Sequence, residues 1–393
     1  MRRIRRMKLA LWKVSAAAIL LAASASVLHA GAVPDATGSP IGDQVLIAGG
    51  EDSGGNALDS AELYDPKLQS FTLLSTAMSD PREHHTCTRI NGKLLVITGG
   101  ENSSAKALQS ADLFNSKERT LSPTHENMVS AHSGQTATLT KAGKVLIAGG
   151  IDDTGAVTGV AENYKNAAGG TFATTANPLR TNRVYQTATR IKGGLVLITG
   201  GIDPSGNVLQ KAEIFNIAHG TFSYTLGNMV NRRTNHTATL LPNGNVLIAG
   251  GYGASGNPQN TAEIFNPGTR TFAPTLSAMH FARAEHTATL LRGGRVFIAG
   301  GFVSNSQITS SAEIYDSTSG TFTIVGPRMT DSRAGHTATL LKNGTVLIAG
   351  GLDQSGAIVT TAEIYNPAGA SSFTATKNPM NAARRYHTAT LIQ

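Results

Sequence analysis

The chain has 393 residues, 40% of them hydrophobic, so it is long enough to bury a large core. Its formal net charge is +8, but six basic residues precede residue 30, where there is no Asp or Glu, and removing them leaves +2. A nearly neutral body without a basic run argues against a nucleic-acid-binding protein. Cys87 is the only cysteine, which excludes an intramolecular disulfide.

The N-terminal segment has the parts of a secretory signal peptide: a basic start, an apolar run over residues 14–28 and small residues around 23–32. We therefore expect a signal peptide over 1–30 with cleavage near 25–32, a linker over 31–42 and a folded domain over 43–393. The apolar run is shorter than the roughly 20 residues of a spanning helix, and an uncleaved anchor is the alternative. This predicts a secreted or periplasmic protein with no stable membrane span after cleavage.

The rest of the chain is a repeat with a period near 50 residues. Gly-Gly pairs begin at residues 49, 99, 149, 200, 250, 300 and 350, and each is followed by an A-[ED]-x-[YF] element such as the one at residues 61–64. A short apolar segment comes next, with an aromatic residue in six copies and Leu121 in the other. Each unit reads as four short strands without a helical stretch.

The most complete copy, residues 233–251, begins R-T-N-H and has apolar strand patterns on both sides of Asn243-Gly244. That dipeptide favours a two-residue hairpin with a type I′ turn. The strand after it is apolar on both faces, which predicts burial on both sides. Together these features resemble the kelch repeat, in which R-x-x-H opens the first strand and Gly-Gly closes the second. The resemblance covers residues 43–393 and implies an all-β, seven-bladed β-propeller.

The two ends of the chain carry incomplete and complementary copies. The first copy starts at its second strand, near Val45, and the last copy ends with a first strand, H-T-A-T-L-I-Q, over residues 387–393. We expect these strands to pair in one blade, because closure of this kind removes exposed strand edges. Deleting residues 387–393 should then open the ring.

A basic residue stands three positions before the first-strand His or Gln in every copy. This set is Arg82, His132, Arg183, Arg233, Arg283, Arg333 and Arg384. One interpretation is an anion-binding collar at the channel, supported by the resemblance, since kelch domains that recognise acidic peptides use arginines near this face. The other is structural pairing with seven acidic residues that also recur once per blade. These are Glu62, Asp112, Glu162, Glu213, Glu263, Glu313 and Glu363.

Two further recurring positions suggest metal sites but fit structural roles better. Five first strands begin with a His and two with Gln135 or Gln186, and equivalent positions on different blades cannot converge on one ion. We expect these side chains to make structural hydrogen bonds. Loops after Gly-Gly often read x-D-x-x-G, as at Asp52, but one carboxylate is far below the six to eight oxygens of a calcium site. No metal or cofactor is expected.

Function should lie where the copies differ, because variable loops on a rigid scaffold carry binding. The residue before the first-strand His or Gln varies most: His84, Gly134, Tyr185, Asn235, Glu285, Gly335 and Tyr386. With Glu83 and His132, these positions should surround one mouth of the channel. The candidate binding residues are therefore Arg82, Glu83, His84, His132, Arg183, Tyr185, Arg233, Arg283, Glu285, Arg333, Arg384 and Tyr386.

The common hydrolase, zinc-protease and phosphate-loop motifs are absent from the sequence. A copper oxidase of the galactose oxidase type, which the resemblance would allow, is disfavoured because Cys87 sits in a strand pattern. We expect a monomeric, non-catalytic scaffold that binds a protein or glycan through one face. The alternative is a periplasmic sugar-modifying enzyme similar to the sialic acid epimerases. It would require a polar cluster such as Arg183, Glu285, Tyr386 and His132 at the channel mouth.

Overall fold

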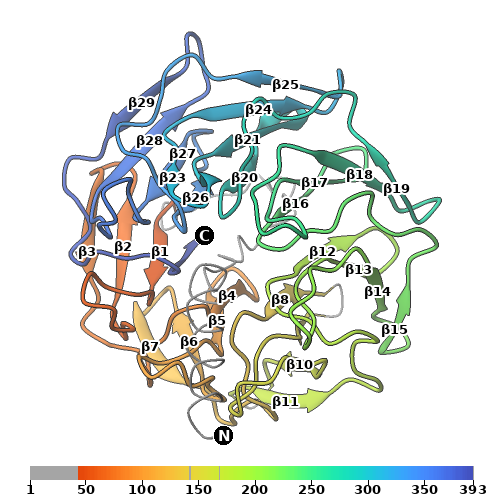
Figure 1. Cartoon of the computed structure of the whole chain (residues 1–393). Helices are drawn as coiled ribbons and strands as arrows, with labels where there is room; N and C mark the ends of the chain where they lie inside the picture. The colour runs from red at the N-terminus through yellow and green to blue at the C-terminus, as the bar shows by residue number, and fades with distance from the viewer. Residues whose placement is uncertain (1–42, 141–142, 168, 393) are drawn as a thin grey trace, which may run out of the picture.

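A computed structural model describes residues 43–140, 143–167 and 169–392 of the chain. The signal peptide and the linker predicted above lie outside the described residues. Seven four-stranded antiparallel sheets surround a central axis like the blades of a propeller (Figure 1). The predicted all-β, seven-bladed fold is therefore confirmed.

The strands occupy equivalent places in every blade. The innermost strands are β30 (Thr388–Leu391), β4 (Thr86–Arg89), β8 (Thr136–Leu139), β12 (Thr187–Ile191), β16 (Thr237–Leu240), β20 (Thr287–Leu290) and β26 (Thr337–Leu340). The second strands are β1 (Val45–Ala48), β5 (Leu94–Thr98), β9 (Lys144–Ala148), β13 (Leu195–Thr199), β17 (Val246–Ala249), β21 (Arg295–Ala299) and β27 (Val346–Ala349).

The third strands are β2 (Ala61–Asp65), β6 (Ala111–Asn115), β10 (Ala161–Lys165), β14 (Ala212–Asn216), β18 (Ala262–Asn266), β24 (Ala312–Asp316) and β28 (Ala362–Asn366). The outermost are β3 (Ser70–Leu73), β7 (Thr120–Pro123), β11 (Thr171–Thr174), β15 (Thr221–Tyr224), β19 (Thr271–Pro274), β25 (Thr321–Ile324) and β29 (Ser372–Ala375). The sixth blade adds a short hairpin of β22 (Phe302–Ser304) and β23 (Gln307–Ile308), and a 3₁₀ turn at Arg292–Gly294.

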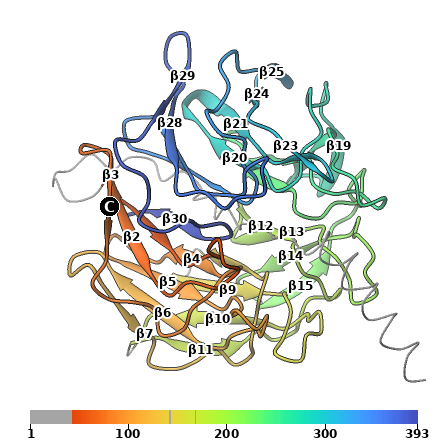
Figure 2. The same ribbon diagram turned by 60° about the vertical axis from the view of Figure 1, so that its left-hand side comes forward.

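The core lies between neighbouring blades, as the apolar second strands predict. All four residues of β17 are buried, because each blade packs one face on the blade before it and the other on the blade after it (Figure 2). Aromatic residues of the third and fourth strands pack within six of the seven blades, as Tyr64 does on Phe71 with ring centroids 4.9 Å apart. The Phe residues of the fourth strand therefore serve as packing anchors.

The hairpin at Asn243-Gly244 differs from the predicted type I′ turn. Gly244 has φ 86°, but Asn243 is not among the residues with positive φ, so the two do not form a type I′ pair. Instead the Gly244 amide donates to the Leu241 carbonyl and the Leu241 amide donates to the Asn245 carbonyl. Pro242 explains the difference, because its ring holds φ near −65° and favours the second position of a type I turn.

The ring closes in the blade that both termini share, as predicted. Strand β30 pairs with β1 through the partners Val45 and Leu391, and the Ile392 amide donates to the Gln44 carbonyl at 2.9 Å. This last bond repeats the Leu241–Asn245 bond of the intact hairpin, so the two chain ends meet at one hairpin position.

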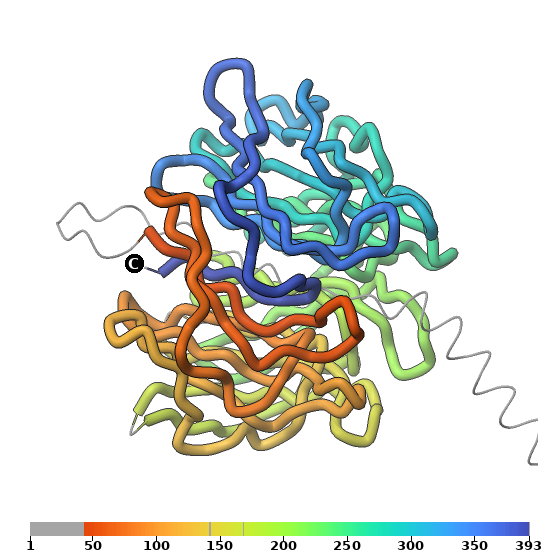
Figure 3. The backbone as a smooth tube through the Cα atoms, turned by 90° about the vertical axis from the view of Figure 1, so that its left-hand side faces the viewer, coloured from red at the N-terminus to blue at the C-terminus, as the bar shows by residue number. Residues whose placement is uncertain are grey.

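The disc has two faces, which Figure 3 shows edge-on. We call one the hairpin face: it carries the first-to-second-strand hairpins and the third-to-fourth-strand turns, since the ladder places Lys144 opposite Lys165. We call the other the loop face: it carries the loops after each Gly-Gly pair and those that lead into the innermost strands. The candidate residues all belong to loop-face segments.

Candidate functional site

The recurring basic residues are buried in ion pairs inside the blades. In each blade the loop into the innermost strand turns its basic side chain toward the carboxylate of the third strand, with N–O distances of 2.7 to 3.1 Å. The six arginines are at most 1% exposed. Six pairs join Arg82 to Asp112, Arg183 to Glu213, Arg233 to Glu263, Arg283 to Glu313, Arg333 to Glu363 and Arg384 to Glu62.

These pairs hold the loop in place through several bonds. Arg233 also donates to the carbonyls of Gly250 and Thr261, and the Glu263 carboxylate accepts the amide of Val230 at 2.7 Å. Burial lowers the pKa of Arg233, and the charge of Glu263 opposes that shift. His132 takes the arginine's place in the third blade, with its Nε2 3.0 Å from Glu162. The pairing interpretation accounts for all seven positions, and the arginines have no surface with which to form a collar.

The first-strand His and Gln side chains join neighbouring blades, as expected of structural hydrogen bonds. His286 Nε2 lies 3.0 Å from the Thr237 hydroxyl of the preceding blade, and Gln135 donates to the Thr98 carbonyl at 2.8 Å. Burial, followed by the nearby arginine charges, lowers the pKa of His286 to about 3. The imidazoles at these positions are therefore neutral at physiological pH.

The variable residues next to them meet at the axis of the ring. All seven have positive φ. Six of them donate a backbone hydrogen bond of 3.1 to 3.3 Å to the carbonyl of the equivalent residue in the preceding blade. The series begins with the Gly134 amide, which donates to His84, and ends with the Tyr386 amide, which donates to Gly335. The His84 ring stacks on Tyr386 with centroids 4.5 Å apart and lies edge-on to Tyr185. These side chains thus fill the centre of the loop face.

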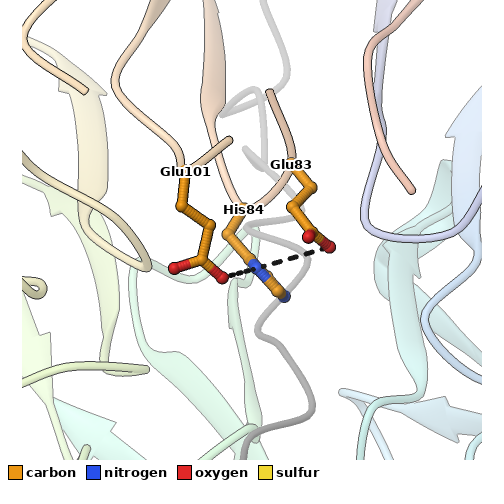
Figure 4. Close-up of side chains that lie close together, drawn as sticks. All are labelled: Glu83, His84 and Glu101. Atoms are coloured by element: carbon orange, nitrogen blue, oxygen red, sulfur yellow. Dashed lines mark hydrogen bonds and ion pairs between the residues drawn. The ribbon is translucent and has the colours of Figure 1, made fainter. Parts of the chain in front are cut away.

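Charged side chains gather on one side of this centre, which we call the charged sector: Glu51, Glu83, His84, Glu101 and Arg385. His84 Nδ1 lies 2.9 Å from Glu101 and 3.7 Å from Glu83, and Figure 4 shows the ring between the two carboxylates. Arg385 pairs with Glu51. The other four side chains of the sector are 9 to 18% exposed, so the sector reaches solvent. They are Glu51, Glu83, Glu101 and Arg385.

The charges of this sector shift each other's protonation. Burial raises the pKa of Glu83 to about 7, although the charge of His84 works against the shift. Burial would lower the pKa of His84, but its hydrogen bond to Glu101 and the carboxylate charges raise it overall. The pKa of Glu101 falls despite its burial, because His84 donates to it. Near neutral pH the sector therefore holds a proton that Glu83 can gain or lose.

Across the axis, Glu285 lies in a less polar setting. The Tyr252 hydroxyl donates to its Oε1 at 3.2 Å and the Tyr386 hydroxyl to its Oε2 at 3.4 Å. Burial raises the pKa of Glu285 well above its usual value, more than these two hydrogen bonds lower it. The residues that follow the Gly-Gly pairs here are Ile151, Ile202, Tyr252, Phe302 and Leu352. This half of the centre is thus largely apolar, opposite the charged sector.

The structure brings together only part of the polar cluster that the enzyme alternative requires. Glu285 and Tyr386 are in contact, whereas Arg183 and His132 are held in their own blades by Glu213 and Glu162. Among the described residues, the group with the geometry to hold a metal ion is Glu83, His84 and Glu101, whose ligand atoms lie within 4.8 Å of one another. The Asp residues of the x-D-x-x-G loops instead form turns, as Asp52 does by accepting the amides of Gly54 and Asn56.

Sequence reasoning missed Glu51, Glu101, Tyr252 and Arg385, which complete the centre. Glu51, Glu101 and Tyr252 directly follow a Gly-Gly pair, and a bridge places Glu101 opposite Glu83 and Glu51 opposite Arg385. The residue after Gly-Gly and the residue two before the first-strand His or Gln vary between copies as strongly as the residue directly before that His or Gln. The same blade-to-blade comparison would have found them.

Comparisons with known proteins agree with the repeat and the fold. A family model described as the Kelch motif matches residues 35–78 and 285–329, in two different blades. A search of curated protein sequences returns no significant match. The described residues contain no helix with the length and apolar character to cross a membrane.

Proposed function

The chain is a kelch-repeat β-propeller, and we propose that it is an exported, non-catalytic scaffold that binds a protein or glycan through the centre of its loop face. Kelch propellers commonly serve as protein-binding scaffolds, which supports the general class. Export rests on the signal-peptide pattern of the first 30 residues.

The loop-face centre is proposed as the binding site on the basis of one observation. The blades repeat their ion pairs, interblade hydrogen bonds and apolar strands, but the two rings of residues around the axis differ from blade to blade. Packing requirements are the same in all blades, so they do not explain a charged sector beside blades 1 and 2 and an apolar half opposite. A single asymmetric partner that approaches along the axis would meet both halves at once.

The charged sector suits a partner with hydrogen-bond donors or a positive charge. Glu51, Glu83 and Glu101 contribute three carboxylates, and Arg385 supplies one fixed positive charge that is already paired with Glu51. Carboxylates accept hydrogen bonds from sugar hydroxyls as well as from Lys and Arg side chains. The neighbouring apolar half would add contact area to such a partner.

Binding can be tested on the chain from residue 31 onward with a glycan array and with crosslinking to cell-envelope proteins. Glu83→Gln and Glu101→Gln should weaken binding of whatever partner is found by tenfold or more, because each removes a carboxylate from the centre. Glu126→Gln, an exposed charge at the outer rim beside Phe172 of β11, is the matched control and should leave binding unchanged. Equal binding by all three variants would place the binding site elsewhere.

A second candidate is a sugar-modifying enzyme with its site at the same mouth. It is favoured by Glu83, whose pKa of about 7 suits a general acid or base, and by the adjacent His84. Proton NMR exchange spectroscopy of sialic acid and neutral aldoses would show faster interconversion of the sugar anomers when the native chain is present. Glu83→Gln would give no acceleration. Rates equal to buffer for the native chain would remove this candidate.

A further inference from the structure

The small net charge of the body conceals a strong separation of charge between the two faces. On the loop face, Asp and Glu outnumber Lys and Arg by 13 to 7, which gives a net charge of −6. On the hairpin face the described residues include 13 Lys and Arg against 4 Asp and Glu, a net charge of +9. The remaining charges are the buried pairs. The body is therefore a disc with one acidic and one basic side.

Most of the basic residues of the hairpin face are exposed and available to a partner. Eleven of them are exposed: Lys67, Lys93, Lys117, Arg119, Lys144, Lys165, Lys192, Arg270, Arg292, Arg295 and Lys342. Arg89 and Arg190 are partly buried. Of the four acidic residues, Asp65 and Asp316 accept backbone amides of their own turns and Asp43 pairs with Lys342. Local partners thus occupy most of the negative charge.

These residues lie on one surface because of the blade topology. Each first-to-second-strand hairpin stands beside the third-to-fourth-strand turn of its own blade, as the Arg295–Asp316 register shows. Neighbouring hairpins are also in contact: Arg292 donates to the Lys342 carbonyl at 2.9 Å, and Arg190 to the Leu139 carbonyl at 3.5 Å. The charges therefore form a ring of tips around the axis rather than a groove.

The chain enters the propeller at this same face. Asp43 stands at the hairpin position next to Lys342, and β1 runs from there toward the loop face. Before cleavage, the predicted signal peptide, with its six basic residues and the apolar run of residues 14–28, is therefore connected to the rest of the chain at the basic face.

We propose that the hairpin face docks on the anionic surface of a phospholipid bilayer, with the loop face and its proposed binding site turned away from the lipid. Seven of the eleven exposed residues are Lys, which act as point charges and suit a diffuse anionic surface more than a bidentate site. Among the described residues of this face the large exposed hydrophobic residue is Leu68, and no Phe, Tyr or Trp is exposed there to stack on bases. A radial ring of charges also does not follow a linear phosphate backbone.

The test is co-sedimentation with vesicles of phosphatidylcholine alone or with 30 mol% phosphatidylglycerol at low salt. All described strands lie within residues 45–391, so the chain from residue 31 onward is used. The triple variant Lys93→Glu, Lys144→Glu, Lys192→Glu should bind the anionic vesicles at least about 100-fold more weakly, at about fivefold for each charge lost. The control Lys106→Glu, Arg232→Glu, Arg328→Glu makes the same charge change on the loop face and should bind like the native chain.

Binding that requires phosphatidylglycerol, disappears in high salt and is lost only in the hairpin-face variant supports the proposal. No binding to the anionic vesicles, or equal weakening by both triple variants, overturns it. Tighter binding to duplex DNA than to the vesicles, measured at the same salt, overturns it in favour of a nucleic-acid partner. All six substituted side chains are exposed, so a melting curve should confirm that both variants fold. This outcome is independent of the loop-face variants that test the proposed function.

Discussion

Six buried guanidinium groups are the largest side chains in the interior with almost no exposed surface, and each is satisfied within its own blade. The guanidinium of Arg233 makes bonds to Glu263, to two backbone carbonyls and to the Thr261 hydroxyl. Such a network holds in place the loop that leads into the innermost strand. If one partner of the ion pair is removed, the other charge stays buried without water to solvate it.

Arg233→Ala should therefore lower the free energy of unfolding by about 3–5 kcal/mol, because Glu263 is left buried without its counter-charge. Urea unfolding followed by circular dichroism measures the change. Arg232→Ala, at the exposed neighbouring residue, is the matched control and should cost less than about 1 kcal/mol. If Arg233→Ala and Arg232→Ala melt alike, the ion pair is not a structural element.

The five buried first-strand histidines predict acid sensitivity. The pKa values of His286 and His387 fall to about 3 in the folded chain, and those of His85, His236 and His336 fall well below the usual value of 6.5. At a pH between the folded-state pKa and the ordinary value of 6.5, these histidines bind protons in the unfolded chain but not in the folded chain. Stability should be complete above about pH 6.5 and fall below it, by on the order of 1.4 kcal/mol per pH unit for each histidine.

The chain itself offers the control for this prediction, since Gln135 and Gln186 fill the same position in two blades. His286→Gln should make an interblade hydrogen bond to a backbone carbonyl, as Gln135 and Gln186 do, and reduce the loss of stability between pH 6.5 and pH 4. Melting temperatures measured across that range provide the test. An unchanged pH dependence in His286→Gln would show that other groups cause the acid sensitivity.

At the scale of the blade, the Gly-Gly pair marks where two backbones come closest. Gly250 has φ +62°, and a Cβ there would lie 2.5 Å from the Arg283 carbonyl oxygen and 2.7 Å from His286. The pair is thus required by the contact between the second strand of one blade and the first-strand loop of the next. Its 50-residue spacing follows from the repetition of that contact.

Gly250→Ala should destabilise the protein by several kcal/mol, because both the positive φ and the contact with a backbone carbonyl oppose a methyl group. Gly256→Ala is the matched control: its φ is +76°, but nothing lies within 4 Å of the added Cβ. The control should cost about 1 kcal/mol, the backbone strain alone. Chemical denaturation of the two variants separates the two contributions, and equal losses would contradict the close-contact explanation.

The sequence predicted elements better than it predicted turns and sites. Gly-Gly spacing and apolar second strands were sufficient for the blades, but Pro242 changed the turn type that Asn243-Gly244 alone suggested. His84, Glu285 and Tyr386 lie near the axis at a position that stands out in the sequence because it varies between copies. The direction of Arg233 depends on backbone angles of the loop that the sequence pattern does not contain. The net charge of the sequence does not show the separation of charge, because the negative loop face and the positive hairpin face largely cancel in the sum.

At the scale of the whole molecule, the closing strand joins the ends of the chain. Deleting residues 387–393 removes β30 and leaves the edge of β1 unpaired, together with the interblade bond between His387 and Thr337. We expect an open ring that aggregates, because an exposed apolar strand edge is a template for pairing with other chains. Size-exclusion chromatography with light scattering measures this, and deletion of Gln393 alone is the control. A soluble monomer with native melting would contradict strand closure.

The hydrogen-bonded ring at the axis also constrains how this protein can change over generations. Gly134 and Gly335 each stand beside a tyrosine, and a Cβ on either would lie 2.8 or 2.6 Å from the ring of Tyr185 or Tyr386. Seven blades therefore share one small central volume, so a larger residue at one position requires a smaller one beside it. We expect these seven positions to covary among descendants as a set, while residues at the rim of each blade diverge independently.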